Sequence, residues 1–259
     1  MPELSDVEGF RRHFHRYAAG RRIEEVGVAD PMLVRNASAS ALRSELTGRR
    51  FGEPERHGKW LIVPAGEARV LIHFGMTGLL VWSSGTNQRH RHDRIVFELT
   101  GGELRYRNMR RLGGLWLARS EAEREELLGP LGPDALALDR DDFAERIAGR
   151  RGGIKSALMD QRVIAGLGNL LTDELLWRTR IHPRRLAARI PKRGLRRMHG
   201  EMTKMLREAN RHARVPGKPG WLTGTRDQRD PRCPRCRSSL RRATIAGRTA
   251  VWCPRCQRG

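Results

Sequence analysis

The chain has 259 residues, and its 51 lysines and arginines outnumber its 29 aspartates and glutamates, which gives a formal net charge of +22 at pH 7. That length suffices for two domains or one large one, and the 38% hydrophobic content is adequate for buried cores. No apolar run approaches a membrane span and the acidic N-terminus is unlike a secretory signal, so we expect a cytosolic protein, with no membrane partner, whose charge attracts a polyanion.

The N-terminal stretch carries the first candidate catalytic group. Removal of Met1 would leave Pro2 with a free secondary amine, which attacks carbon when it is neutral. Ser5 and Glu8 have the spacing of a helix capping box, which predicts that a helix begins close to Pro2. The positive end of that helix disfavours a cation, so the amine should hold a larger neutral fraction near pH 7. Glu3 lies beside it as an acid/base partner.

This first helix is expected to continue to Gly20, a residue type that commonly ends helices. Apolar side chains recur at helical spacing at Val7, Phe10, Phe14 and Tyr17, which predicts one buried face.

Between residues 21 and 117 the chain consists of short apolar or alternating runs broken by Gly and Pro, a pattern typical of strands. Thr100-Gly101-Gly102 predicts a tight hairpin between two of them. The regular spacing predicts a β-sandwich or barrel behind the first helix. The expected strands cover residues 59–63, 70–74, 79–82, 95–99, 104–106 and 115–117.

After Ser120 the sequence changes to helical periodicity. In the last expected helix a methionine-rich apolar face lies opposite a basic face, and we interpret the two as packing and solvated surfaces. Residues 215–232, rich in Gly, Pro and charge, are expected to form a loop or linker. The expected helices cover residues 120–128, 141–147, 154–159, 170–178 and 192–212.

All four cysteines of the chain lie near its end, in two C-x-x-C pairs, Cys233 with Cys236 and Cys253 with Cys256. Four thiolates with this spacing can surround a Zn²⁺ ion tetrahedrally, and a segment this short has too small a core to fold alone. Two disulfides are the alternative, but a cytosolic environment would keep them reduced. The sequence therefore predicts one structural zinc, with no coordination position left for catalysis.

Four stretches, in this order, resemble the formamidopyrimidine-DNA glycosylase / endonuclease VIII family. They are the Met-Pro-Glu-Leu start, the run Gly-Leu-Gly-Asn-Leu-Leu-Thr-Asp-Glu at residues 166–174, Ile181-His182-Pro183, and Gly247-Arg248-Thr249 before the last cysteine pair. The resemblance spans nearly the whole chain. It implies an α+β multidomain fold: an N-terminal β-sandwich with a leading helix at 1–119, a helix-two-turn-helix domain at 120–228 and a zinc-finger hairpin at 229–259.

The same resemblance implies a bifunctional DNA glycosylase and abasic-site lyase that acts on oxidised bases in duplex DNA, as a monomer at the nucleoid. Pro2 matches the family's imine-forming nucleophile and Glu3 its acid/base partner. Lys59 matches the lysine assigned to β-elimination of the 3′ phosphate, and Arg248 matches the zinc-finger arginine assigned to δ-elimination of the 5′ phosphate. A cation near a phosphate favours its departure.

Further positions match the family's DNA contacts. Asn169, at an expected helix start, matches an asparagine that holds a phosphate, although an ordinary N-cap is the alternative. Met76 matches the residue that fills the gap left by a flipped nucleotide, and Arg110 would face the orphaned base. His92 and Arg150 match further DNA-contacting positions.

The sequence departs from the family pattern at several places. Leu112 stands where formamidopyrimidine-type members usually have Phe, Met109 replaces a common Pro, and Ser5-Asp6 replace Pro-Glu. The loop from Gly217 to Cys233 is short. These departures leave oxidised purine and oxidised pyrimidine open as the preferred lesion.

Three alternatives remain from the sequence. A catalytically inactive homologue would keep the DNA-binding residues and the zinc finger. An RNA-binding zinc-ribbon protein would explain the charge and the cysteines. The arginine content can also reflect a proteome-wide bias, although the 5% aromatic content favours duplex over single-strand recognition. His90 and His92 without a carboxylate cluster are weak evidence for a second metal site.

Overall fold

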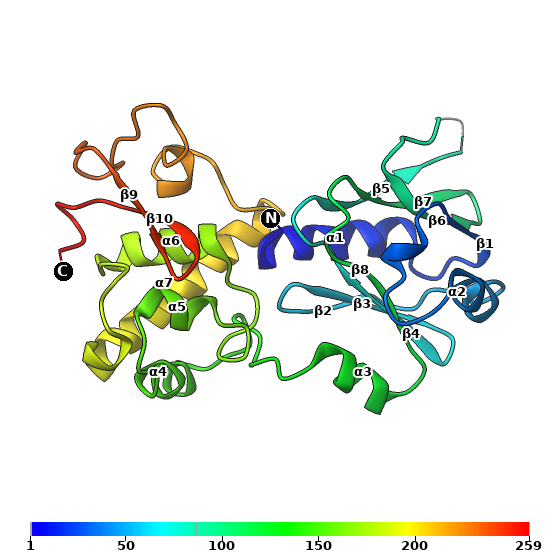
Figure 1. Ribbon diagram of the computed structural model, residues 1–259, viewed down its shortest axis with the longest axis horizontal. Helices are drawn as coiled ribbons and strands as arrows, with labels where there is room; N and C mark the ends of the chain where they lie inside the picture. The colour runs from blue at the N-terminus through cyan, green and yellow to red at the C-terminus, as the bar shows by residue number, and fades with distance from the viewer. Residues whose placement is uncertain (1, 86–87, 259) are drawn as a thin grey trace. The chain divides into compact units, whose positions relative to one another are not determined.

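The computed structural model describes residues 2–85 and 88–258 and consists of two compact units (Figure 1). Unit 1 comprises Pro2 and Asp6–Gly129, and unit 2 comprises Glu3–Ser5 and the chain from Pro130 onward. The first helix therefore begins in unit 2 and continues in unit 1. Met1, whose removal the sequence argument requires, lies outside the described residues.

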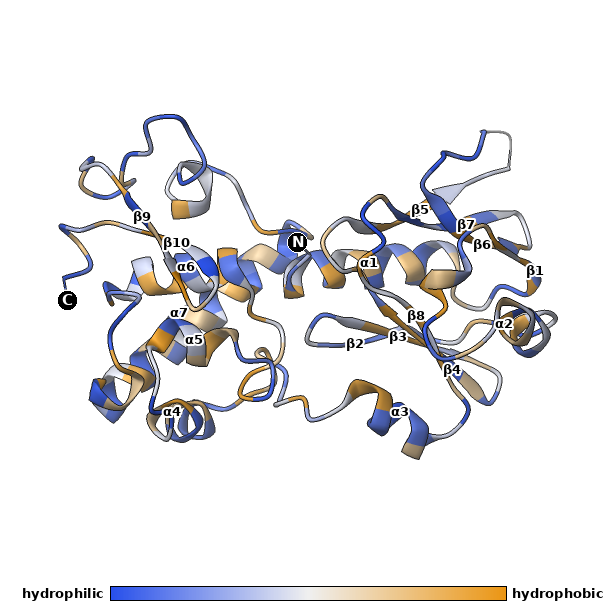
Figure 2. Ribbon diagram, in the orientation of Figure 1, coloured by the Kyte–Doolittle hydropathy of each residue, from blue (hydrophilic) through white to orange (hydrophobic). Residues whose placement is uncertain are grey.

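Helix α1 (Leu4–Tyr17) forms where the apolar periodicity predicted it, but its start differs from the expected capping box. The helix already includes Ser5, whose hydroxyl is buried and has no hydrogen-bond partner among the residues that the structure describes. Glu8 instead binds Arg11 and Arg12 through its carboxylate, at 2.9 and 3.1 Å. Figure 2 shows hydrophobic and hydrophilic residues alternating along α1, as expected for a helix with one buried face.

Two four-stranded antiparallel sheets form the body of unit 1 and confirm the predicted sandwich. The first sheet has the order β1 (Ile23–Val28), β6 (Asp93–Leu99), β7 (Gly102–Asn108), β5 (Gly78–Ser83). The second has the order β2 (Glu55–His57), β3 (Trp60–Ala65), β4 (Ala68–His73), β8 (Gly114–Ala118). Strands β6 and β7 meet at the predicted Thr100–Gly102 hairpin. Strands β1 and β2 were not predicted.

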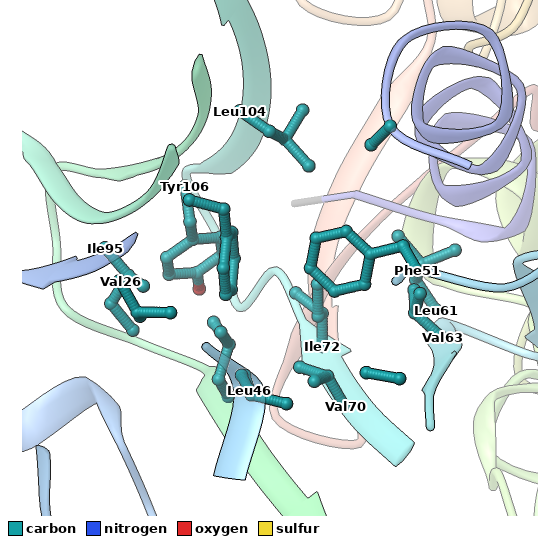
Figure 3. Packing of buried hydrophobic residues seen from close by; sticks show 14 of the residues in the cluster. Val26, Leu46, Phe51, Leu61, Val63, Val70, Ile72, Ile95, Leu104 and Tyr106 are labelled. Atoms are coloured by element: carbon teal, nitrogen blue, oxygen red, sulfur yellow. The ribbon is translucent and has the colours of Figure 1, made fainter. Parts of the chain in front are cut away.

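The core of unit 1 lies between the two sheets. Figure 3 shows Val26, Ile95 and Tyr106 of the first sheet on one side and Leu61 and Val63 of the second on the other. Val7 and Phe14 of α1 belong to the same cluster and are fully buried. The leading helix is thus part of the sandwich core.

Two further helices belong to unit 1. Helix α2 (Ala39–Leu46), which was not predicted, begins at Ser38, whose hydroxyl accepts the Ala41 N–H. Helix α3 (Glu121–Leu128) packs Leu127 and Leu128 against the outer face of the second sheet. The compact unit consequently ends at Gly129, ten residues beyond the domain boundary that we expected at residue 119.

Unit 2 contains four helices and one hairpin among its described residues. They are α4 (Arg140–Ala148), α5 (Ile154–Met159), α6 (Asn169–Thr179), α7 (Lys192–Arg211), β9 (Arg241–Ile245) and β10 (Arg248–Trp252). Unit 2 also has 3₁₀ turns at Ala187–Arg189 and Leu222–Gly224, and unit 1 has one at Pro31–Leu33. The methionine-rich face of α7 is buried, as predicted. Contacts group the cysteine hairpin with the helices, in one compact unit rather than two.

The segment 215–232, which we expected to be a loop or linker, is irregular and is anchored to unit 2 by a few buried side chains. The Trp221 side chain is buried, its indole N–H donates to Glu208 at 3.2 Å, and Arg178 lies over its ring. Leu222 and Arg226 are also buried. Trp221 therefore belongs to the core of unit 2, whereas residues 227–230 of the segment are exposed. None of the helices in the described part of the chain is long and apolar enough to cross a membrane.

Candidate functional site

The Glu3 carboxylate is held at the start of α6, within unit 2. It accepts backbone N–H groups from Gly168 at 2.9 Å, Leu170 at 2.7 Å and Leu171 at 3.1 Å. These groups are the free donors at the start of α6, so Glu3 caps a helix far away in the sequence. The positive end of α6 favours the negative charge of this carboxylate, which is 1% exposed.

Two glycines make room for this arrangement. A Cβ on Gly168 would lie 2.4 Å from the Glu3 carboxyl carbon, and a Cβ on Gly166 would lie 2.5 Å from a Leu4 methyl group. Gly166 also has a φ of +117°, and its carbonyl accepts the Leu4 N–H at 3.2 Å. Leu4 is buried in the core of unit 2. The residues that follow Pro2 are therefore held by backbone and side chain together.

Asn169 is the first residue of α6, but it does not cap the helix. Glu3 occupies that role, and the Asn169 side-chain oxygen is buried with no hydrogen-bond partner among the described residues. The ordinary N-cap alternative for Asn169 is therefore wrong. Asn169 itself lies at a helix N-terminus, where anions bind readily.

Lys59 lies at the tip of a tight hairpin in unit 1. Gly58 and Lys59 form the turn between β2 and β3, and Gly58 has a φ of +58° there, which suits glycine. Burial and the nearby Lys59 charge lower the pKa of His73 to about 4, so this imidazole is neutral at physiological pH. The His73 ring packs on Trp60, with centroids 4.9 Å apart.

A buried network begins at Asn108, the last residue of β7, which is fully buried. Its amide nitrogen donates to the Tyr106 hydroxyl at 2.9 Å and to the Leu112 carbonyl at 2.7 Å. Its amide oxygen accepts the Thr77 hydroxyl at 3.1 Å, and that hydroxyl accepts the Arg110 N–H at 3.1 Å. Burial raises the pKa of Tyr106 to about 12, against the effect of the Asn108 hydrogen bond.

Asn108 thereby joins the three loops that carry the predicted DNA contacts of unit 1. Met76 is 41% exposed on the loop before β5, and its sulfur lies 3.7 Å from the Arg110 guanidinium. The Asn108 backbone N–H also donates to the His92 carbonyl at 2.9 Å. The structure therefore brings Met76, Arg110 and His92 onto adjoining loops.

His92 itself is exposed and surrounded by cations. Slight desolvation and the charges of Arg91 and Arg94 lower the pKa of His92. His90 stacks loosely on it, with ring centroids 5.1 Å apart. Among the described residues, no third metal-ligating side chain joins this histidine pair. His92 thus presents a neutral imidazole on a basic loop.

A buried ion triad attaches the hairpin of unit 2 to its helices. Asp173 of α6 binds Lys155 at 2.6 Å and Arg226 at 2.8 Å, and it accepts the Val251 N–H at 3.0 Å. Lys155 also donates to the Thr249 carbonyl at 3.1 Å. Burial lowers the pKa of Lys155 and raises that of Asp173, while their direct contact opposes both shifts. The triad fixes strand β10 from its middle.

Arg248 opens β10 and is exposed beside the turn formed by Ala246 and Gly247, whose φ values are +51° and +69°. It therefore extends from the tip of a rigid hairpin. Arg150 is also exposed, but it is paired with Asp160 at 2.6 Å. Exposed pairs of this kind contribute about 1 kcal/mol or less, so a phosphate can replace the carboxylate.

The four cysteines form a closed metal-ligand set. Their sulfur atoms all lie within 4.8 Å of one another, with 3.4 Å between Cys236 and Cys253 and 4.0 Å between Cys233 and Cys256. Tetrahedral zinc with four thiolates places sulfurs about 3.8 Å apart, so the donor type and the spacing fit that ion. The Trp177 indole N–H donates to the Cys233 sulfur at 3.3 Å, as outer-shell donors commonly do.

Family models match three parts of the chain. Residues 1–115 match the formamidopyrimidine-DNA glycosylase N-terminal domain, residues 131–215 the H2TH domain of the same enzymes, and residues 231–259 the zinc finger found in FPG and IleRS. The chain belongs to the formamidopyrimidine-DNA glycosylase family. It is a DNA glycosylase, as its motifs predicted, and its four cysteines hold one structural zinc.

Curated members of the formamidopyrimidine-DNA glycosylase family align along the full chain. The enzyme of Symbiobacterium thermophilum is 35% identical and covers 99% of this chain and 89% of its own length. The enzyme of Methylococcus capsulatus is 34% identical, and that of Geobacillus kaustophilus 32% identical, each over 100% of both chains. The predicted three-part organisation is therefore that of the whole family protein.

Solved structures of the same family share the fold. The wild-type Lactococcus lactis Fpg (MutM) in complex with a N7-benzyl-Fapy-dG containing DNA matches with a TM-score of 0.90 and 26% identity, over 100% of both chains. The complex of Lactococcus lactis Fpg with an abasic site containing DNA also matches at 0.90, covering 99% of this chain and 100% of that one.

Motif matching in this family missed the residues that hold the site together. These residues are buried polar side chains, and most of their partners lie on other elements: Asn108, Lys155, Asp173 and Arg226. Two weak signals were present in the sequence. Asp173 lies within the quoted motif, and Lys155 is a charged residue on the apolar face of a short expected helix.

Proposed function

We propose that this chain removes oxidised bases from duplex DNA and cleaves the resulting abasic site through the amine of Pro2. The observation that carries the proposal is the Glu3 carboxylate, which three N–H groups of α6 hold immediately after Pro2. A nucleophile beside a positioned carboxylate is the pairing that imine chemistry requires.

The first step transfers the sugar from the base to the protein. The neutral Pro2 nitrogen forms a bond to C1′, and the glycosidic bond breaks with its electron pair leaving on the base, which takes up a proton. The Glu3 carboxylate then accepts the proton of the new ammonium and delivers it to O4′ as the C1′–O4′ bond opens. The product is an iminium joining Pro2 to the opened sugar.

The iminium then permits two eliminations. Loss of a 2′ hydrogen as a proton sends electrons into the iminium and breaks the C3′–O3′ bond, which releases the 3′ phosphate. Loss of the 4′ hydrogen releases the 5′ phosphate in the same way, and water returns Pro2 as the free amine. We assign Lys59 to stabilising the first departing phosphate and Arg248 to stabilising the second, because both are cations at hairpin tips.

We assign the contacts with DNA to residues from unit 1 and from unit 2. Asn169 and Arg150 in unit 2 and His92 in unit 1 would hold phosphates, since each lies on a loop or at a helix start. Met76 would fill the gap left by the flipped nucleotide, and Arg110 would face the unpaired base. The contact between Met76 and Arg110 supports this joint assignment.

The substrate class follows from the relatives. Curated relatives are named formamidopyrimidine-DNA glycosylases, and the Lactococcus lactis complexes contain Fapy-dG or abasic DNA. We therefore favour ring-opened purines over oxidised pyrimidines as substrates. The enzyme would act as a monomer at the nucleoid, where duplex DNA is the polyanion that its charge predicts.

Reductive trapping tests the proposal. Borohydride added with an abasic duplex should convert the iminium into a stable amine, and the adduct should map to residue 2. An N-terminal tag that retains Met1 blocks the amine and should abolish trapping, whereas Pro2→Gly provides a primary amine and should retain part of it. Normal trapping by the tagged protein would move the nucleophile elsewhere, and no trapping by the wild type would favour an inactive homologue.

A further inference from the structure

A basic hollow lies in unit 2 between the end of α6 and the start of α7. Its volume is about 420 Å³, and it has an apolar floor that includes Ile181 and Ile190. Five exposed arginines and one histidine surround it: Arg180, Arg185, Arg193, Arg197, Arg258 and His182. We call these six residues and the floor the arginine surface.

Within the described residues, 2–85 and 88–258, the arginine surface has no counter-charge. No aspartate or glutamate lines the hollow, and none of its five arginines has a carboxylate within ion-pair distance in the described part of the chain. Elsewhere the chain pairs exposed arginines readily, as Arg196 with Asp141 at 2.6 Å. Five unpaired guanidinium groups around one hollow repel one another, so an external anion would stabilise them.

The basic region extends beyond this hollow. Three further hollows adjoin it and share Arg180, His182, Arg185 or Arg258 with it, and they too contain no acidic side chain among the described residues. One of them adds Arg235 and Arg255, which lie within the two C-x-x-C pairs. A continuous row of basic hollows suits an extended polyanion better than one small anion.

Helix ends add to the positive potential. Pro191 and Gly194 at the start of α7 line the hollow, so the N-terminal N–H groups of a 20-residue helix lie at its edge. The opposite effect of the α6 C-terminus is reduced, because Arg235 donates to the carbonyls of Trp177 and Arg178.

The arginine surface is separate from the residues assigned to the lesion. Asn169 and Arg180 lie at opposite ends of α6, whose 11 residues span about 16 Å at 1.5 Å per residue. Arg248 and Trp252 likewise lie at opposite ends of β10, about 13 Å apart at 3.3 Å per residue. The surface therefore faces the distal ends of both elements that carry predicted DNA contacts in unit 2.

We propose that the arginine surface binds the phosphate backbone of a second DNA duplex while the lesion site holds the first. Arginine is suited to phosphate through its planar, two-pronged donors. The aromatic rings at this surface do not form stacking platforms, because Trp252 is only 8% exposed and its ring meets that of His182. Backbone contact with duplex DNA is thus favoured over single strands.

A second duplex site has a kinetic consequence. A protein that touches a new duplex before releasing the old one can pass directly between them, so its dissociation rate depends on the concentration of competitor DNA. Without the second site, release from the first duplex precedes any new contact, and the rate is independent of competitor. This difference separates the proposal from general electrostatic attraction.

The test uses the full protein bound to a short fluorescent duplex with a tetrahydrofuran abasic-site analogue. Stopped-flow dissociation by unlabelled duplex should accelerate as competitor rises for the wild type, and should stay constant for the variant R185Q/R193Q/R197Q/R258Q. The control R22Q/R49Q/R140Q/R207Q removes the same charge from scattered, exposed arginines and should behave as the wild type. Both variants should incise a short lesion duplex normally, which keeps this test independent of the proposed catalysis.

Salt dependence gives a second measurement. Binding of the second duplex should lose up to about 0.9 in log–log salt slope for each phosphate contact removed by the substitutions. A competitor with an uncharged methylphosphonate backbone should not accelerate dissociation from the wild type, an arm that needs no variant to fold. A constant wild-type rate, an unchanged rate profile in the clustered variant, or acceleration by polyglutamate but not by duplex would overturn the proposal.

Discussion

The Glu3 carboxylate lies so close to the Gly168 Cα that a side chain at position 168 would collide with it. The Gly168 N–H donates to Glu3 Oε2 at 2.9 Å, and a Cβ at that position would lie 2.4 Å from the Glu3 carboxyl carbon. The glycine is required for close approach rather than for its backbone, because its φ of −121° is open to all residues.

Gly168→Ala should therefore move Glu3 away from the α6 N-terminus while leaving the fold intact. We expect base excision to fall by at least about 100-fold, since a 1 Å misplacement in an active site can cost that much. Single-turnover incision of a lesion duplex measures the loss. Gly200→Ala is the matched control, because a Cβ there meets nothing within 4 Å, and it should retain full activity. Equal activity in both variants would show that the Glu3 position is not critical.

The relation between Glu3 and Gly168 also shows where sequence reasoning stops. The residue types were visible, and Pro2-Glu3 and the 166–174 run were both selected as motifs. Their contact was not, because it joins residues 165 positions apart and depends on the fold. Local spacing instead suggested the Ser5–Glu8 capping box at the start of α1, where the Leu4 N–H donates to the Gly166 carbonyl and Glu8 binds Arg11 and Arg12.

Secondary structure was predicted best where periodicity was strong. The expected strands at 59–63, 70–74 and 95–99 and the helix at 192–212 correspond to β3, β4, β6 and α7. Strand β1 escaped because its sequence, IEEVGV, has two adjacent glutamates and a glycine. The burial of Trp221 and Arg226 was not predicted because the composition of residues 215–232 is that of a loop. These two side chains are buried through their partners on α7 and α6.

Loss of zinc should release the hairpin that carries Arg248. Four thiolates close the site, so chelation or Cys236→Ser should remove the metal and unfold the finger. The expected result is weaker duplex binding together with β-elimination products that no longer proceed to δ-elimination. Metal analysis and gel separation of the cleavage products measure the two effects. Normal DNA binding by the zinc-free protein would contradict this assignment.

Acid should destabilise unit 1 through His73. Burial, aided by Lys59, lowers its folded pKa to about 4 from 6.5, so the unfolded chain binds the proton more readily. Stability is therefore full above pH 6.5, falls as the pH drops toward 4, and levels off below that. The shift corresponds to about 3 kcal/mol at 1.36 kcal/mol per pKa unit.

The difference between wild type and His73→Asn isolates this term from the carboxylates. The asparagine oxygen can still accept the Gly75 N–H that His73 accepts at 3.2 Å. Urea unfolding between pH 4 and 8 should show a gap between the two proteins that changes by about 3 kcal/mol across that interval. Parallel curves would assign no proton uptake to His73.

Asn108 and Met76 should affect the same step of the reaction. Asn108→Leu removes the hydrogen bonds to Tyr106, Thr77 and the Leu112 carbonyl at nearly constant volume, and each buried group left unpaired costs about 1–3 kcal/mol. The loops that carry Met76 and Arg110 should then lose their fixed positions. Because Met76 is assigned to filling the gap after flipping, both Asn108→Leu and Met76→Ala should slow excision of a damaged base more than cleavage of a preformed abasic site.

A double-mutant cycle decides whether Asn108 acts by positioning Met76. If it positions Met76, the double variant should lose little more excision rate than either single variant, whereas independent effects would add. Fluorescence of 2-aminopurine opposite the lesion reports the insertion of Met76 into the duplex, separately from the stability of the protein. Asn108→Leu should reduce this signal at a temperature where the protein is fully folded. Equal losses on damaged and abasic substrates would instead assign Asn108 and Met76 to packing alone.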